Sequence, residues 1–374
     1  MRICIITEYF PKSENFEIKG GAEASAFNEA YQLSKNHQVT VLTSLEEGFP
    51  SEYEIKGIKV ICCGKERYYV QGGSFLNRIS FMKDAIKVGK ILDINLVIGY
   101  NFITHLVAWK ISRKLNIPAV ARYHDVWIGE WFKNMGLSGL AGEILERYNL
   151  SRNFDLIISV SDYTRKNLEK YFPANKIKVV PNIVDFPAVK SEKFNETTIS
   201  CVARLVEYKK VDDLIRAVSI LKKEFPDLKC KIVGTGPMEM KLKSLSKELD
   251  LDGSIEFLGF VEKHEDVLKI VNSSHIFCLP SIVEGFGIVI VEAMGCGVPF
   301  VASRIPPVME ASNQKGGLFF EPENWQNLAE TIRTILKDPE LYKNLQKEGL
   351  EQSKKYQGEN IGNELEKLFL NLIN

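Results

Sequence analysis

The stretch from Ile276 to Ser303, IFCLPSIVEGFGIVIVEAMGCGVPFVAS, constrains the fold of this chain more than any other segment. It opens and closes with short apolar runs, and both runs predict buried strands. Between them, Ile288 to Met294 predicts a helix that ends at Gly295. A strand, a helix and a second strand in this order form a βαβ unit, and such units build parallel sheets.

Two carboxylates interrupt this apolar stretch. Glu284 precedes Gly285-Phe286-Gly287 at the start of the predicted helix, where unpaired backbone N–H groups and the helix dipole favour an anion such as phosphate. Glu292 lies inside the helix, where a carboxylate is costly unless a donor or a ligand hydroxyl satisfies it. The two are about two helical turns apart, so both can line one cleft. On this stretch alone they could also be a helix-start carboxylate and a carboxylate bonded to backbone.

Strand and helix signals alternate through the first half of the chain, which indicates a parallel sheet covered by helices. Strands are predicted at 3–7, 38–43, 58–62, 96–100, 119–123, 156–159 and 177–180. Helices are predicted at 22–36, 76–92, 104–114, 138–152 and 162–171.

A polar segment with two prolines, 181–196, predicts a connection between domains, and a second alternation follows it. Its strands are predicted at 198–203, 229–233, 255–258, 276–280 and 300–303, and its helices at 211–225, 238–249, 264–273 and 288–294. From Asn324 onward the chain is predicted helical, with breaks at Asp338-Pro339 and Gln357-Gly358. We therefore expect an α/β protein of two Rossmann-like, doubly wound domains that face each other across a cleft.

Length and composition agree with two soluble globular domains. A chain of 374 residues exceeds the usual size of a single core, and 45% hydrophobic and 26% charged residues are ordinary values. Lysine and arginine total 48, as do aspartate and glutamate, so there is no general attraction to nucleic acid. The seven cysteines include no CxxC, and Cys4, Cys201, Cys230 and Cys278 lie in apolar strands as small buried thiols. With no secretion signal and no transmembrane helix predicted, we expect a cytoplasmic protein.

Candidate binding residues follow the predicted strands, at the edge where open α/β sheets bind ligands. Arg204 and Lys209 come after strand 198–203, and two cations can neutralise a diphosphate, although they could also be surface cations at a helix start. Gly20-Gly21 precedes the first helix, and bare glycines let backbone approach phosphate or sugar, although a plain turn would look the same. His124-Asp125 ends strand 119–123, a place that favours a functional histidine over a structural one.

Gly234-Thr235-Gly236-Pro237 follows a strand and opens a helix, as a dinucleotide fingerprint would. The third glycine of that fingerprint is missing, because position 239 is Glu. An NAD site is therefore not expected here.

Taken together, these motifs resemble the family 4 retaining glycosyltransferases, which have the GT-B fold, and the resemblance covers essentially the whole chain. It rests on Glu284-x7-Glu292 with Gly-Phe-Gly after the first Glu, on ARLVEYKK around Arg204 and Lys209, on the glycine loop and His-Asp pair of the first half, and on the turns 234–237 and 259–261. Lys210 stands where a glycine is common. The resemblance implies an acceptor-side domain over 1–185, a nucleotide-sugar domain over 186–357 and a C-terminal helix over 358–374 that returns to the first domain.

The resemblance also assigns roles to residues. Arg204 and Lys209 would hold the diphosphate and stabilise its growing charge without a metal or any other cofactor, and His124 would orient the sugar. Glu292 would bind ribose hydroxyls, and Glu284 would bind the sugar and phosphate with the backbone that follows it. The expected catalytic residues are His124, Arg204, Lys209 and Glu284, and the expected substrate-binding residues are Gly20, Gly21, Asp125, Gly234, Val261, Gly285, Phe286, Gly287, Ile288 and Glu292.

The function so implied is retaining transfer of a hexosyl unit from a nucleoside-diphosphate sugar, UDP-linked before GDP-mannose, to a glycan or glycolipid acceptor in surface polysaccharide or glycolipid synthesis. One alternative is a catalytically silent sugar-nucleotide-binding protein. The other is a glycoside hydrolase, which needs two carboxylates on opposing sides of the scissile bond, whereas these two belong to one βαβ unit beside two cations.

The predicted helix 76–92 suggests contact with the inner face of a membrane. Ile79, Met82 and Ile86 form an apolar stripe at helical spacing, beside the basic positions 83, 87 and 90. Aromatic residues at 68–69, 127, 131 and 132 are expected on the same domain. We expect weak peripheral association with anionic lipid, and the alternative is a helix packed on the sheet with a solvated lysine face.

Overall fold

A computed structural model describes residues 1–13, 20–68, 75–132, 136–185 and 191–373 of the chain. Its contacts divide the chain into two compact units. Unit 1 comprises Met1–Ile183 and Gly358–Asn374, and unit 2 comprises Val184–Gln357. Tyr69, one of the aromatic residues expected on this domain, and the middle of the predicted connection lie outside the described residues.

Unit 1 is built on one eight-stranded sheet in the order β3-β4-β2-β1-β5-β6-β7-β8. Every pairing is parallel except β3 with β4, which is antiparallel and sits at one edge. The polar sequence of β3 gave no strand signal, so the sequence predicted only the parallel part. The strands are β1 Arg2–Ile6, β2 Gln38–Glu46, β3 Glu52–Ile55, β4 Ile58–Arg67, β5 Leu96–Gly99, β6 Ala119–Tyr123, β7 Leu156–Ser159 and β8 Ile177–Val179.

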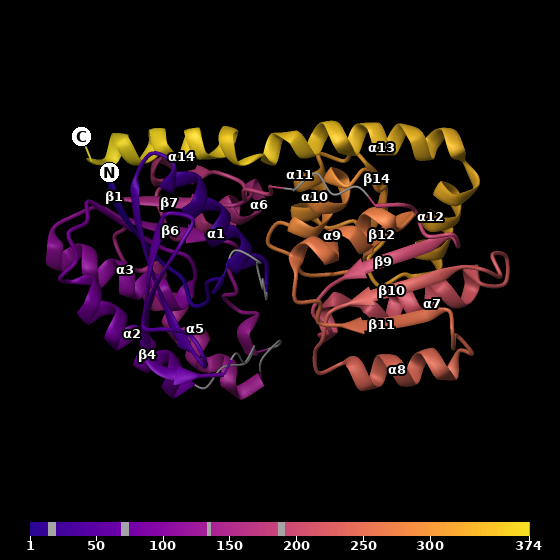
Figure 1. Ribbon diagram of the computed structural model, residues 1–374, viewed down its shortest axis with the longest axis horizontal. Helices are drawn as coiled ribbons and strands as arrows, with labels where there is room; N and C mark the ends of the chain where they lie inside the picture. Colours follow the sequence, from indigo (N-terminus) through magenta and orange to yellow (C-terminus); the bar gives the residue numbers. More distant parts are fainter. Residues whose placement is uncertain (14–19, 69–74, 133–135, 186–190, 374) are drawn as a thin grey trace. The chain divides into compact units, whose positions relative to one another are not determined.

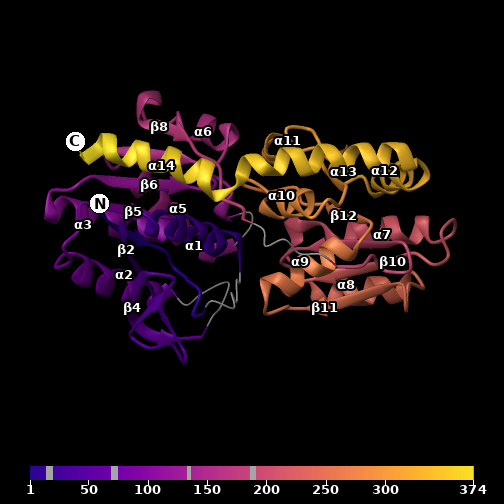
Figure 2. The ribbon, with the colours of Figure 1, turned by 45° about the horizontal axis from the view of Figure 1, so that its top comes forward.

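Helices cover both faces of this sheet because its strands are apolar on both sides. In β1, Cys4 and Ile6 pack with α2 and α3 in one core, while the alternate residues Ile3 and Ile5 are buried on the other side. Figures 1 and 2 show α1 and α14 side by side in unit 1. The helices are α1 Gly21–Ser34, α2 Phe75–Gly89, α3 Phe102–Leu115, α5 Gly139–Leu150 and α6 Asp162–Leu168. The predicted helix 138–152 is a 3-10 turn, Gly136–Ser138, followed by α5.

The C-terminal helix α14, Gly358–Ile373, belongs to unit 1. Leu365 and Phe369 are fully buried, and a Cβ on Gly362 would lie 2.2 Å from the side chain of Gln32 on α1. The return of the chain to unit 1 therefore depends on an apolar face and on one close approach between helices.

Unit 2 is a six-stranded parallel sheet in the order β11-β10-β9-β12-β13-β14. Chain order reverses between β9 and β12, which makes that pair the topological switch point. The strands are β9 Thr198–Val202, β10 Lys229–Val233, β11 Ile255–Gly259, β12 Ile276–Leu279, β13 Phe300–Ser303 and β14 Gly317–Phe320. The helices are α7 Val211–Leu221, α8 Glu239–Glu248, α9 His264–Ser273, α10 Ile288–Gly295, α11 Pro306–Ser312, α12 Trp325–Lys337 and α13 Pro339–Ser353. Of these elements, the sequence missed α11 and β14.

The helix α2 packs on the sheet and exposes lysines to solvent, as in the alternative given for the predicted helix 76–92. Phe81 and Ala85 are buried, and Met82 and Ile86 of the predicted stripe are partly buried against the same core. Lys83 and Lys87 remain exposed. Among the helices that the structure describes, none is long and apolar enough to cross a bilayer.

Candidate functional site in unit 2

The loops that follow β9 and β12 are joined at the switch point of unit 2. The backbone N–H of Ile282, in the second loop, donates to the carbonyl of Tyr208, in the first, at 2.9 Å. Because ligands of open α/β sheets bind outside the carboxyl ends of the strands at a switch point, this is the expected position of a ligand in unit 2.

Lys209 and Glu284 form an ion pair across the two loops. The Lys209 Nζ donates to Glu284 Oε1 at 2.6 Å, and only 13% and 12% of their side chains are exposed. Arg204 lies farther out: it is exposed, and its Nη2 donates to the Tyr208 hydroxyl at 2.6 Å. The structure thus gathers one sheltered cation, one exposed cation and one carboxylate at this edge.

Lys210 adopts a left-handed backbone conformation, which is the one that the resemblance's glycine would favour at this position. Its φ is +49°, in the left-handed region, where side chains other than Gly are disfavoured. Lys210 precedes the first residue of α7, and its Nζ lies 3.1 Å from Glu323 Oε1. The lysine therefore takes the conformation that glycine favours.

Two glycines of the Gly234-Thr235-Gly236 turn lie against the β9 loop. A Cβ on Gly234 would lie 2.0 Å from the Ala203 carbonyl oxygen, and one on Gly236 would lie 2.3 Å from that of Leu205. The Gly234 N–H donates to the carbonyl of Gly259 at 2.7 Å, just before Val261. Close backbone packing thus requires these glycines, whether or not a ligand is bound.

The helix α10 starts where the sequence predicted, directly after Gly287. Gly287 has φ +88°, which favours glycine, and Phe286 is buried with its ring 5.4 Å from that of Tyr356. Gly285, Phe286 and Gly287 therefore form the turn that carries Glu284 on one side and α10 on the other.

The carboxylate of Glu292 is satisfied by a histidine that the sequence analysis missed. Glu292 is 6% exposed, and His264 Nε2 lies 3.0 Å from its Oε1. Burial lowers the pKa of His264, but the charge and hydrogen bond of Glu292 outweigh it, so the net pKa is raised. The only sequence signal was the position of His264 at the start of the helix predicted at 264–273; the pairing is a tertiary contact.

In unit 1, the predicted residues lie at loops that follow β1 and β6. Burial, aided by the charge of Arg122, lowers the pKa of His124 to about 3, so this imidazole is neutral at pH 7. Its Nε2 is buried with no hydrogen-bond partner in the described part of the chain. Asp125 accepts a hydrogen bond from Trp127 Nε1. Gly20 has φ −175°, and no atom of the described residues would lie within 4 Å of a Cβ added to it; Gly21 opens α1.

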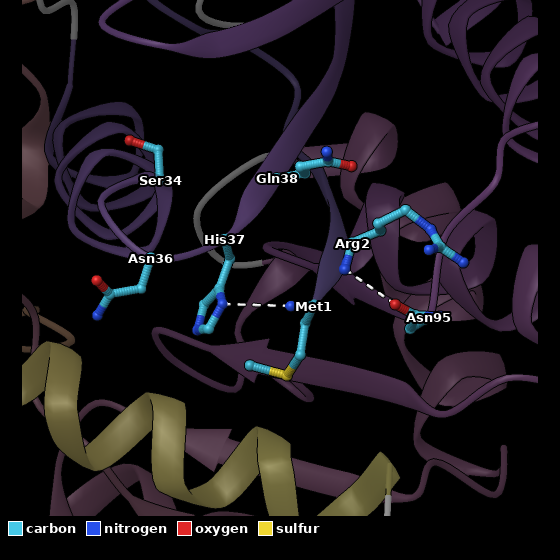
Figure 3. Close-up of a pocket in the computed structure, with 7 residues that line it drawn as sticks. All are labelled: Met1, Arg2, Ser34, Asn36, His37, Gln38 and Asn95. Carbon is cyan, nitrogen blue, oxygen red and sulfur yellow. Dashed lines mark hydrogen bonds between the residues drawn. The ribbon is translucent and has the colours of Figure 1, made fainter.

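A hollow of about 490 Å³ in unit 1 lies at the opposite edge of the sheet, at the amino ends of β1 and β2 (Figure 3). His37 Nδ1 lies 3.3 Å from the Met1 nitrogen there, and Arg2 N–H donates to Asn95 Oδ1 at 3.0 Å. None of the predicted site residues lines it. It lies at the amino ends of the strands, whereas ligands of open α/β sheets bind outside the carboxyl ends. Among the described residues, no three His, Cys, Asp or Glu side chains group as metal ligands would.

Comparison with known proteins finds similarity over both halves of the chain. The family described as Glycosyl transferases group 1 matches residues 185–352, and Glycosyltransferase Family 4 matches residues 19–186. An uncharacterised glycosyltransferase of Methanocaldococcus jannaschii is 30% identical over 75% of this chain and 78% of its own length. Another, of Haemophilus influenzae, is 28% identical over 88% of this chain and 90% of its own.

Solved structures share the fold at low sequence identity. Sucrose-phosphate synthase from Thermosynechococcus elongatus has a TM-score of 0.84 and 19% identity, over 99% of this chain and 98% of that one. Anabaena HepE in complex with UDP-glucose has a TM-score of 0.75 and 18% identity, and both chains are covered in full. With two Rossmann-like units, matches over both halves and a relative at 30% identity, this chain belongs to glycosyltransferase family 4 and has the GT-B fold.

Proposed function

We propose that unit 2 binds a nucleoside-diphosphate sugar at the β9 and β12 loops, and that the chain transfers the hexosyl group with retention. The observation that carries this proposal is the convergence of Arg204, Lys209 and Glu284 at the switch point. Beside them, Glu292 of α10 is paired with His264 of α9. Two cations match the two charges of a diphosphate, and carboxylates match sugar and ribose hydroxyls.

In the proposed reaction, the bond between the anomeric carbon and the phosphate oxygen breaks while the acceptor hydroxyl oxygen bonds to that carbon from the same face. The acceptor proton passes to the departing phosphate. Arg204 and Lys209 stabilise the charge that grows on the phosphate, so no metal is required. His124 is neutral at pH 7, which suits an imidazole that orients sugar hydroxyls by hydrogen bonds.

We favour a UDP-sugar as donor, with GDP-mannose next. The likeness of HepE, solved with UDP-glucose, supports UDP only by analogy, because 18% identity shows the fold alone. The proposed acceptor is a glycan or a lipid-linked glycan in surface polysaccharide or glycolipid synthesis, met at the cytoplasmic face of a membrane.

The test is an incubation of the purified chain with UDP-glucose, UDP-N-acetylglucosamine or GDP-mannose, in the presence of EDTA, with a panel of glycan and glycolipid acceptors. We expect nucleoside diphosphate release that depends on an acceptor, and an α-linked product by NMR. Binding without turnover on every acceptor would indicate a silent sugar-nucleotide-binding protein. Cleavage of free oligosaccharide, without use of any nucleotide sugar, would indicate a hydrolase. Loss of activity in EDTA would contradict metal independence.

A further inference from the structure

The helix α5 of unit 1 exposes its apolar side chains to solvent. Leu137, in the turn that precedes the helix, is 85% exposed, and Leu140, Ile144 and Tyr148 are 59%, 61% and 41% exposed. Spacings of three and four residues place these four on one side of the helix. We call them the α5 apolar face.

The opposite side of α5 carries polar groups into the protein. Glu146 is buried and accepts hydrogen bonds from the backbone N–H of Trp127, at 3.2 Å, and from Trp131 Nε1, at 2.5 Å. Asn149 is also buried, and its Nδ2 donates to the carbonyl of Phe102 at 2.5 Å. Leu145 and Leu150 also pack into the core, so α5 carries apolar side chains inward as well as outward. A surface helix of a soluble protein normally keeps its apolar side chains on the inward side alone.

These contacts also fix the rotation of the helix. A Cβ on Gly142 would lie 2.6 Å from the Trp131 ring, so α5 is packed tightly at that point. Rotation that buried Leu140 and Ile144 would break the hydrogen bonds of Glu146 and Asn149. The α5 apolar face therefore stays exposed, and a contiguous exposed apolar face of this kind marks a binding surface.

We infer that the α5 apolar face docks on a lipid bilayer with anionic headgroups. Four side chains are far fewer than the roughly 20 to 30 residues that each partner contributes to a standard protein interface. A bilayer needs no matching shape. From Leu137 to Tyr148 the face spans about 17 Å of helix, which suits a helix that lies in the interface plane.

Cations at one end of this face favour anionic headgroups over a second copy of the chain. Arg147 is exposed, although it pairs with Glu143 on the same helix, and the Arg152 guanidinium stacks on the Tyr148 ring at 4.1 Å. A tyrosine ring with a stacked guanidinium is amphipathic, and such groups sit at headgroup level. In a symmetric dimer built on this face, the same cations would face their own copies.

The α5 apolar face differs from the lysine face of α2, and membrane binding through the two surfaces should depend differently on salt concentration. Docking through α5 is mainly apolar, so binding should persist at high salt, whereas binding through exposed lysines should be lost. Docking also goes beyond the proposed transfer reaction, because it needs neither donor nor acceptor.

The test is flotation of the full chain with vesicles of phosphatidylcholine and phosphatidylglycerol, at 50 and 500 mM NaCl. We expect the wild-type chain to float at both salt concentrations. Leu140→Glu/Ile144→Glu should lower the bound fraction about tenfold or more. A matched control, Ile91→Glu/Leu370→Glu, changes two other exposed apolar residues of unit 1 and should float like the wild type. Lys83→Glu/Lys87→Glu should also float.

Several outcomes would overturn the inference. These are no flotation of the wild type at 50 mM NaCl, unchanged flotation of Leu140→Glu/Ile144→Glu, or loss of flotation in Lys83→Glu/Lys87→Glu. A wild-type dimer in sedimentation velocity that Leu140→Glu/Ile144→Glu dissociates, with no flotation, would assign the face to a second copy. Leu140→Ser/Ile144→Ser should show the same loss, and thermal melts check that the variants fold. UDP should stabilise wild type and variants alike, so failure here is separable from failure of the proposed function.

Discussion

Lys209 Nζ lies 2.6 Å from Glu284 Oε1, although 75 residues separate the two in the chain. The cation proposed to hold the donor phosphate is thus already paired with a carboxylate. Donor binding must either share this lysine between carboxylate and phosphate or move it from one to the other. The pair therefore has a structural role and a proposed catalytic role, and both can be measured.

Lys209→Met should lower transfer about 10²- to 10³-fold, which corresponds to about 2.7 to 4 kcal/mol of transition-state stabilisation. It should also lower the free energy of unfolding by about 1 to 3 kcal/mol, because Glu284 is left sheltered and unpaired. Urea unfolding and product assays measure the two effects. Lys243→Met breaks the exposed pair with Glu239 and should change neither by much.

Lys209→Met/Glu284→Gln separates the two roles. Removing both charges should restore most of the lost unfolding free energy while transfer stays low. If transfer returned together with stability, Lys209 would have only the structural role.

Loss of the imidazole in His264→Gln should change the pH dependence of stability. The folded-state pKa of His264 is raised, so its contribution is fully present below the unfolded value of about 6.5 and is lost as pH rises through the folded value. The unfolding free energy of the wild type, minus that of the variant, should therefore fall above pH 6.5. Taking this difference cancels the contributions of histidines that both proteins share, such as His124, whose pKa is lowered. A difference that is flat across this range would contradict the pairing with Glu292.

Two glycine substitutions separate packing from ligand contact. Gly234→Ala should destabilise the chain by about 2 kcal/mol or more, because its Cβ meets the Ala203 carbonyl at 2.0 Å and its φ is +128°. Gly20→Ala should leave the melting temperature unchanged, because Gly20 has an extended backbone and an added Cβ would meet no atom of the described residues within 4 Å. Any loss of transfer in Gly20→Ala would then indicate that a ligand lies close to the backbone of Gly20. A large loss of stability in Gly20→Ala would contradict its described environment.

Tryptophan fluorescence should titrate near neutral pH. Burial raises the pKa of Glu146 to about 7, and Glu146 accepts hydrogen bonds from the Trp127 backbone and the Trp131 ring. Ionisation of this carboxyl beside Trp131 should shift the emission with a midpoint near pH 7. Glu146→Gln keeps the shape of the side chain and should remove the transition. A transition that persists in the variant would belong to another group.

The sequence predicted the parallel strands and the helices closely because their apolar patterns are local. It predicted the place of Glu284, Lys209 and Gly287 from strand ends and glycines. It missed β3, whose EYEI sequence is polar, and β14, which begins at the second glycine of the pair Gly316-Gly317. The pairings of His264 with Glu292 and of Lys209 with Glu284 join residues from different elements, so no local pattern contains them. The exposed face of α5 was missed because amphipathic spacing does not tell which side of a helix faces inward.

Hydrogen exchange with and without UDP tests the central claim most directly, because it locates the nucleotide on the chain. We expect protection to concentrate at residues 203–210, 234–238, 260–264 and 282–292, the loops and helix starts that gather at the switch point of unit 2. Lys209→Met/Glu284→Gln should reduce that protection. Protection confined to other segments, such as the hollow beside His37, or no protection by UDP or GDP at any concentration up to the millimolar range, would contradict the account.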